Sequence, residues 1–322
     1  MIRLLLIFLL GFKMVFDIIA QQDPQFSQYM YNQLVINPGY AGSQEAICLT
    51  GVHRQQWMGL PGAPTTSVFT VSTPFVFPPR RGEDAKVIEH GFGLLIMNDQ
   101  IGFNQNTSIG ASYAYRFSPG FSGGKLGIGI SGIYFNKQLD ATWRVPGGGD
   151  ASGDIAIPEP QERIPAFDMG LGIFYSSPNV YMGISATHLL EPKFYENASY
   201  KLRRQYYATA GTFLPFQNPA WEFAPSLIAH SDGTIFQLAA NANFIYNKKV
   251  WGGMGYRLND AVIVMIGFDI FNGLKIGYAF DYTYTNLQTQ FTAGGSHEIV
   301  LNYCFNLIKE RVVKKYKSVR FL

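Results

Sequence analysis

Long hydrophobic runs and charged residues are both scarce in this chain of 322 residues. No internal run of about 18 apolar residues occurs, and this absence excludes membrane-spanning helices. Charged residues make up 15% of the sequence, whereas an ordinary soluble domain has about 25%. The net charge of +3 is too small and too dispersed for a nucleic-acid-binding protein. Aromatic residues, by contrast, reach 15%. Such a chain is either a large soluble β protein or an outer-membrane β-barrel.

Sequence patterns of catalytic and metal sites are also missing. The glycines of the G-x-G-x-x-G at Gly127–Gly132 lie within a continuous strand alternation, whereas a dinucleotide fingerprint needs a helix after the strand. Five scattered histidines lack the spacing of a metal site, and no G-x-S-x-G nucleophile elbow occurs. Glu159 and Glu162, in a Pro-rich stretch, fit solvated charges better than a catalytic pair. The sequence therefore predicts no enzymatic activity, no catalytic residue, no metal and no cofactor.

The first 20 residues have the pattern of a secretory signal peptide. Arg3 precedes an apolar run from Leu4 to Gly11, and the small residue Ala20 precedes polar Gln21. The run is far shorter than the about 20 residues that span a bilayer. We expect cleavage after Ala20, so that the mature chain begins near Gln21 in an oxidising compartment.

Alternation of apolar residues with small or polar ones recurs along the rest of the chain. In Leu274–Tyr282 every even position is aliphatic or aromatic, and the odd positions are Lys, Gly, Ala and Asp. Residues 167–176 follow the same pattern with Phe174 as an exception. The second face of a soluble sandwich would carry lysines and glutamates, but here it carries mostly Gly, Ala, Ser and Asn. The pattern indicates a transmembrane barrel with lipid outside and a polar lumen.

Counting these segments predicts an all-β fold, a transmembrane antiparallel β-barrel of about 14 strands, an even number as in single-chain bacterial barrels. The expected strands are residues 46–57, 65–75, 90–98, 105–117, 124–136, 165–176, 179–188, 205–214, 220–230, 235–246, 249–258, 261–270, 274–284 and 296–306.

Connection lengths give the orientation, because periplasmic turns are short and extracellular loops are long. If the first strand runs outward, the long connections at 137–164, 189–204 and 285–295 face the outside. The charged connection 76–89 breaks this pattern. It either contacts a partner or shows that a strand pair is misplaced.

The chain therefore divides into a signal peptide (1–20), an N-terminal segment (21–45), the outer-membrane barrel (46–306) and a basic tail (307–322). Asn37, Pro38, Gly39 and Gly42 are turn residues, so the N-terminal segment is no strand. Side chains alone cannot fill a barrel of 14 strands, so an open channel or a plug is expected. The segment is either a periplasmic lead-in to the first strand or a plug at or inside the periplasmic mouth. We favour the plug.

The N-terminal segment and several stretches of the barrel carry a family resemblance. The matching elements include "DPQFSQY" from Asp23, "NPGYAG" from Asn37, "RQQWMG" from Arg54 and "MGISATHLLEP" from Met182. They resemble the PorP/SprF family of outer-membrane proteins from the type IX secretion and gliding systems of Bacteroidota, over the whole mature chain. The family-motif residues, expected to be structural or partner-binding, are Asp23, Pro24, Phe26, Asn37, Pro38, Ala41, Gly42, Arg54 and Trp57.

The resemblance implies a non-enzymatic barrel in the cell outer membrane, surrounded by lipid. Its partners would be periplasmic ring lipoproteins of the type IX machinery, a secreted surface protein such as an adhesin, or both. The alternative is an outer-membrane channel for a small or lipophilic solute, which would have no reason to carry the opening motifs. Neither hypothesis involves nucleic acid.

Two further features concern the ends of the barrel. Basic residues crowd the tail, and Lys314, Lys315 and Lys317 are candidate partner contacts, although they could equally bind anionic lipid or peptidoglycan.

Cys48 and Cys304 fall on the first and last strands, face inward and lie near the periplasmic rim. A disulfide across the closing seam requires suitable register. Otherwise the two are unpaired lumen residues.

Overall fold

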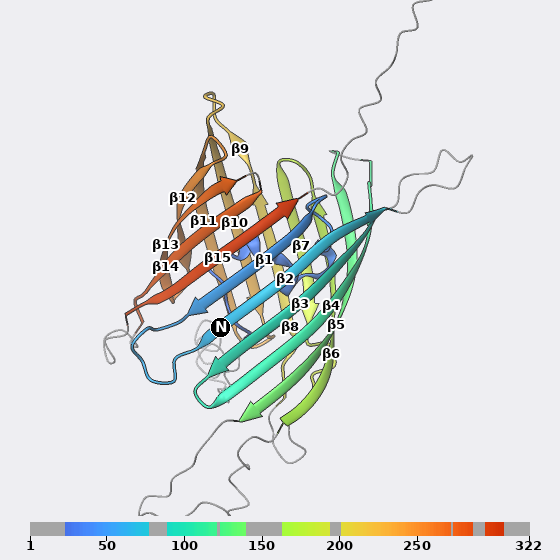
Figure 1. The fold of residues 1–322 in the computed structure, drawn as a ribbon, viewed down its shortest axis with the longest axis vertical. Helices are drawn as coiled ribbons and strands as arrows, with labels where there is room; N and C mark the ends of the chain where they lie inside the picture. Colours follow the sequence, from blue (N-terminus) through green and yellow to red (C-terminus); the bar gives the residue numbers. More distant parts are fainter. Residues whose placement is uncertain are drawn as a thin grey trace, which may run out of the picture.

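The computed structural model describes residues 23–76, 89–120, 123–139, 163–193, 201–271, 273–285 and 294–305. They form one antiparallel sheet that closes into a barrel, with β1 beside β15 (Figure 1). Of the 15 strands in the sheet, all except the two-residue β9 make up a ring of 14. No helix in these ranges is long and apolar enough to cross a membrane.

The strands follow the alternation of the sequence closely. They are β1 (Ile47–Gln55), β2 (Thr65–Val76), β3 (Glu89–Ile101), β4 (Asn104–Phe117), β5 (Lys125–Leu139), β6 (Arg163–Ser176), β7 (Val180–Thr187), β8 (Gln205–Thr212), β9 (Leu214–Pro215), β10 (Trp221–Ser231), β11 (Phe236–Tyr246), β12 (Val250–Arg257), β13 (Ala261–Phe271), β14 (Leu274–Thr283) and β15 (Ser296–Phe305). The prediction of a barrel of 14 strands is confirmed.

The outer wall is an apolar belt, because one side chain in two along each strand points out of the barrel. On β13, Val264 and Phe268 are exposed, whereas the alternate residues Ile263 and Met265 are buried. The belt suits lipid contact. The inward positions differ from the expected polar lumen, since several are large and apolar. They pack against a segment of the chain that occupies the lumen.

The two ends of the barrel differ in their connections. At one end, here called the terminal end, β1 begins and β15 ends, and Ile47 pairs with Phe305. At the other, the loop end, lie the long connections between β5 and β6, β7 and β8, and β14 and β15. Residues 77–88 lie outside the described part, but Val76 pairs with Glu89. The β2–β3 pair is therefore not misplaced.

Residues 23–46 lie inside the ring, where Figure 1 shows the earliest described part of the chain behind the strands. They contain three short helical turns: η1 (Tyr29–Tyr31), α2 (Gln33–Ile36) and η2 (Pro38–Tyr40). We call residues 23–46 the lumen segment. Its contacts with the wall form the core of the molecule.

Candidate functional site: the lumen segment and its anchors

The lumen segment runs along the barrel from the loop end to the terminal end. Asp23 contacts His188, just beyond β7 at the loop end. Tyr31 packs against Trp251 near the start of β12. Glu45 contacts Lys125, the first residue of β5, at the terminal end. The sequence analysis favours a plug at or inside the periplasmic mouth, whereas in the structure the segment extends along most of the lumen.

The first anchor is a buried charged cluster around Ser27. Glu298 of β15 accepts hydrogen bonds from the backbone N–H groups of Ser27 (2.7 Å) and Gln28 (2.8 Å). Arg54 of β1 donates to Glu298 (3.1 Å) and to Asp281 of β14 (2.7 Å). The Ser27 hydroxyl lies between Arg54 and Asp281, at 2.7 Å from both Arg54 Nη1 and Asp281 Oδ2. Arg54 is 1% exposed. Such a cluster holds the segment because each buried charge would be costly without its partners.

Arg257 of β12 and Asn241 of β11 complete this anchor from the other side. Arg257 contacts Asp281 at 3.2 Å and donates to the Ser27 hydroxyl at 3.1 Å. Asn241 donates to the backbone carbonyl of Ser27 at 2.9 Å. Side chains from five strands, including Arg54 and Glu298, therefore converge on one serine and its neighbour.

The second anchor holds Asp23 at the loop end. Its carboxylate accepts hydrogen bonds from His188 Nε2 and the Tyr207 hydroxyl, each at 2.8 Å. His188 Nδ1 lies 2.5 Å from Asp168 of β6. Burial alone would lower the pKa of His188, but the two carboxylates outweigh it and raise the pKa to about 10. Burial would likewise raise the pKa of Asp23, but the His188 cation leaves it below its usual value. His188 is therefore a charged bridge between the segment and the wall.

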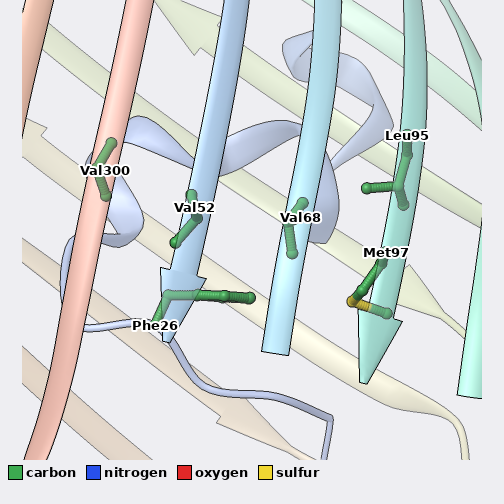
Figure 2. Packing of buried hydrophobic residues seen from close by; sticks show 6 residues of the cluster. All are labelled: Phe26, Val52, Val68, Leu95, Met97 and Val300. Atoms are coloured by element: carbon green, nitrogen blue, oxygen red, sulfur yellow. The ribbon is translucent and has the colours of Figure 1, made fainter. Parts of the chain in front are cut away.

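An apolar cluster lies between these two anchors. Phe26 points from the lumen segment toward the side of Val68, near Val52 (Figure 2), and Val300 belongs to the same cluster. The same cluster includes Leu95 and Met97. The strands provide inward valines, leucine and methionine here because the segment, rather than water, occupies this part of the lumen. Burial of such side chains contributes roughly 1.5–3 kcal/mol each.

The "NPG" turn fits the segment against β5 and β6. The Asn37 side chain accepts a hydrogen bond from Gly39 N (2.9 Å) and donates to the carbonyl of Ile173 (3.0 Å). Pro38 begins η2, a position where its missing N–H costs nothing. A methyl group added at Gly39 would lie 2.9 Å from the carbonyl oxygens of Gly127 and Gly172. The turn therefore requires glycine for this close approach.

The remaining motif residues also contact the wall. Ala41 is fully buried, and the backbone N–H of Gly42 donates to Ser72 at 2.9 Å. Pro24 lines a cavity at the loop end. Trp57 lies in the β1–β2 connection, where its backbone N–H donates to the Ser296 hydroxyl at 3.2 Å. Eight of the nine motif residues thus belong to the lumen segment or directly contact it, and Trp57 fixes a loop.

The two cysteines meet at the seam. Cys48 pairs with Cys304 in the β1–β15 register, and the structure joins them in a disulfide with their Cα atoms 4.1 Å apart. Lys314, Lys315 and Lys317 lie outside the described residues. Within the described part of the chain, no three His, Cys, Asp or Glu side chains are grouped to hold a metal ion.

Apart from Arg54, sequence reasoning missed the wall residues of both anchors. In the sequence, Asp168, Asp281 and Glu298 look like ordinary inward or end positions, and His188 looks like one of several scattered histidines. Their strands are far apart in sequence, so no spacing links them to Ser27 or Asp23. The available signal was a carboxylate at an inward position of a strand.

Two larger cavities remain beside the segment. One of about 200 Å³ lies at the loop end and includes Asp23, Asp99 and Lys137 in its lining. One of about 510 Å³ lies toward the terminal end and includes Gln33 and Trp251. The two share no lining residue within the described ranges. The lumen segment separates them.

Comparison with solved structures finds similar chains at low sequence identity. Similar solved structures include the outer membrane protein Omp33 of Acinetobacter baumannii, with 8% identity, a TM-score of 0.44, and coverage of 81% of this chain and 97% of that one. Another is the toluene transporter TbuX of Ralstonia pickettii, with 10% identity, a TM-score of 0.47, and coverage of 86% and 93%. The comparison with curated proteins gives no match.

The family comparison covers the barrel and the lumen segment together. The model of the type IX secretion system membrane protein PorP/SprF matches residues 18–303. This chain is therefore an outer-membrane β-barrel and belongs to the PorP/SprF family of type IX secretion system membrane proteins.

Proposed function

We propose that this protein is a plugged, non-enzymatic barrel that serves the type IX machinery as an attachment point rather than as a pore. It contacts periplasmic ring lipoproteins, holds a secreted surface protein such as an adhesin, or does both. The observation that carries the proposal is the lumen segment, whose polar anchors and apolar cluster occupy the space that a solute would need.

The strength of the anchors supports a plug that stays in place. Glu298, Asn241, Ser226, His188 and Ser72 each bond to the segment. Each of these hydrogen bonds contributes roughly 0.5–1.5 kcal/mol net. Together with the buried ion pairs, they stabilise the seated segment by several kcal/mol relative to an open lumen. An open state would then be a minor population.

A pull-down in mild detergent tests the attachment role. Recovery of periplasmic ring lipoproteins or of a large secreted surface protein with the intact barrel supports it. Recovery of neither, combined with solute-dependent uptake by vesicles that contain the protein, would replace it with the channel alternative. Steady conductance of the intact protein in a planar bilayer would contradict the plug.

The basic tail is the proposed contact on the periplasmic side. The terminal end should face the periplasm, since it has the shorter turns, and Lys314, Lys315 and Lys317 come after β15. Deletion of residues 312–322 should leave a heat-modifiable barrel but reduce recovery of ring lipoproteins. If recovery is unchanged, the tail binds lipid or peptidoglycan instead.

The loop end is the proposed contact for a secreted surface protein. Its largest connections are β5–β6 and β7–β8, and loops carry binding residues more often than the strands that hold them. Deletion of residues 147–153 should lower retention of that protein at the cell surface without affecting insertion of the barrel. Retention that survives deletions in every long loop would locate the contact elsewhere.

A further inference from the structure

The wall formed by β3, β4 and β5 extends further toward the loop end than its apolar belt does. β4 and β5 have 14 and 15 residues, whereas β12 and β13 have 8 and 11. On β4, the outward residues from Ile109 to Phe117 are apolar or aromatic. In a strand tilted by about 40°, this stretch is roughly 20 Å high, close to the about 25 Å of a typical apolar band. The outward positions of β4 nearer the loop end therefore lie beyond the belt.

Six neutral polar side chains occupy the outward positions beyond the belt, in two rows across these strands. They are Asn98, Thr107 and Asn136 in the first row and Gln100, Gln105 and Gln138 in the second. None of the six is buried. The alternate residues Asp99, Asn106 and Lys137 line the loop-end cavity, so the six side chains point away from the lumen. We call the six residues the amide patch.

The amide patch is specific to this side of the barrel. On β13, the outward residues from Val262, next to the loop end, to Ile270 are all aliphatic or aromatic. There the apolar belt reaches the end of the strand. The patch is therefore a local extension of the wall rather than a rim that every strand shares.

With the loop end outside, as proposed above, the amide patch lies at the height of the lipid headgroups. Thr107 and Gln105 lie about 5 and 10 Å above Ile109 along the membrane normal. The headgroup layer on each side of a bilayer is about 5–8 Å thick. Tyr134 and Phe167 lie in the same row as Ile109, with 5.1 Å between their ring centroids, and aromatic residues are typical of the membrane interface. The patch is thus continuous with the lipid-facing belt.

The composition of the amide patch favours a saccharide as its ligand. The six side chains are uncharged, whereas phosphate groups are bound by Arg and Lys. The patch also lacks the aromatic, Met and Arg side chains that are enriched at protein interfaces. Side-chain amides both donate and accept hydrogen bonds, which matches the hydroxyl groups of a sugar. Asn98 Nδ2 donates to Thr107 Oγ1 at 3.0 Å, so the orientation of that amide is fixed.

We propose that the amide patch binds the saccharide headgroup of a glycolipid in the outer leaflet, whose acyl chains lie on the apolar belt below. The acyl chains contact the row of Ile109 and Tyr134, and the sugar contacts the two polar rows above it. The proposal uses the orientation given above, with the loop end outside, but it does not depend on the attachment role. It gives the barrel one preferred side, formed by β3, β4 and β5, for glycolipid.

Two lipids with identical acyl chains test the headgroup contact. Digalactosyldiacylglycerol has a neutral disaccharide headgroup, and phosphatidylcholine has none. Native mass spectrometry of the full barrel, in a polyoxyethylene detergent without sugar, measures the binding of each lipid. We expect at least about fivefold tighter binding of the glycolipid, because several hydrogen bonds to the amides are gained. Equal binding of the two lipids would overturn the proposal.

Matched variants locate the contact on the wall. Gln105→Leu combined with Asn136→Leu keeps similar side-chain sizes but removes two amides, so glycolipid binding should fall to the level of phosphatidylcholine. Thr73→Val, near the terminal end of β2, is the control and should leave the preference intact. A preference that survives in the double variant would refute the proposal. Loss of a surface protein from the pull-down of the double variant, with lipid binding unchanged, would replace the glycolipid by a protein partner. Heat-modified gel mobility verifies that each variant is folded.

Discussion

Glu298 connects the lumen segment to the closing strand, and its removal should loosen the segment measurably. Glu298→Ala takes away the acceptor of two backbone N–H groups, of Ser27 and Gln28, and the carboxylate that pairs with Arg54. Each buried N–H left without a partner costs about 1–3 kcal/mol, and breaking a buried ion pair costs about 3–5 kcal/mol. These costs overlap, so we expect a loss of at least about 3 kcal/mol.

The assay is the labelling rate of a thiol introduced by Asn32→Cys. Asn32 is 2% exposed, so a bulky maleimide reaches this position after the segment has moved. A loss of about 3 kcal/mol corresponds to roughly a 100-fold larger open population, and the labelling rate should rise to the same extent. Glu191→Ala, which removes a surface pair with Lys201, is the control and should change the rate by less than about twofold. An unchanged rate for folded Glu298→Ala would refute the reasoning.

Three further predictions use the same introduced thiol or the native cysteines. Gly39→Ala forces a methyl group against backbone oxygens and should destabilise the seated lumen segment by about 1–3 kcal/mol, which raises the labelling rate. In the control Gly132→Ala the methyl group meets no atom within 4 Å, so the labelling rate should stay unchanged. Equal labelling rates for the two variants would show that the turn can shift. The pKa of His188 is raised from 6.5 to about 10, so its stabilisation of the seated segment is present at neutral pH and is lost as the pH rises through about 10. The labelling rate, normalised to that of a cysteine peptide at each pH, should increase as this stabilisation is lost. A normalised rate that does not change with pH would contradict the charged bridge. Cys48 and Cys304 should resist thiol reagents in unreduced, denatured protein, and full labelling of both would exclude the disulfide.

The strands were predictable from the sequence because the period of two is a local property. Leu274–Tyr282 alternates cleanly, and β14 covers nearly the same residues. Phe174, the exception to the alternation in residues 167–176, is also informative. It lies at an inward position, where its ring packs edge to face against Tyr40 of the lumen segment, with 5.1 Å between the ring centroids. A large apolar residue at an inward position indicates something apolar opposite it.

The anchors were not predictable because they depend on which strands face each other across the lumen. Arg54 could be assigned to the inward face, but its partners lie 227 and 244 residues away. Ile263 and Met265 similarly occupy inward positions on β13 that make sense only beside Trp251 and the lumen segment. The pairing register within the ring follows from local pattern, while contacts across its interior depend on what fills it.

The lumen segment precedes β1 in the chain, and β1 pairs with β15 to shut the ring. Cys48 and Cys304 mark that final contact, with a separation of 256 residues in sequence, so it joins the most distant parts of the fold and is expected late in assembly. Glu298 and Asp281, on the last two strands, bond to Ser27, so the arriving strands bring two of the five side chains that hold this serine. The barrel therefore has a natural template: strands wrap around a leading peptide that recruits the last of them, and an empty ring need never form.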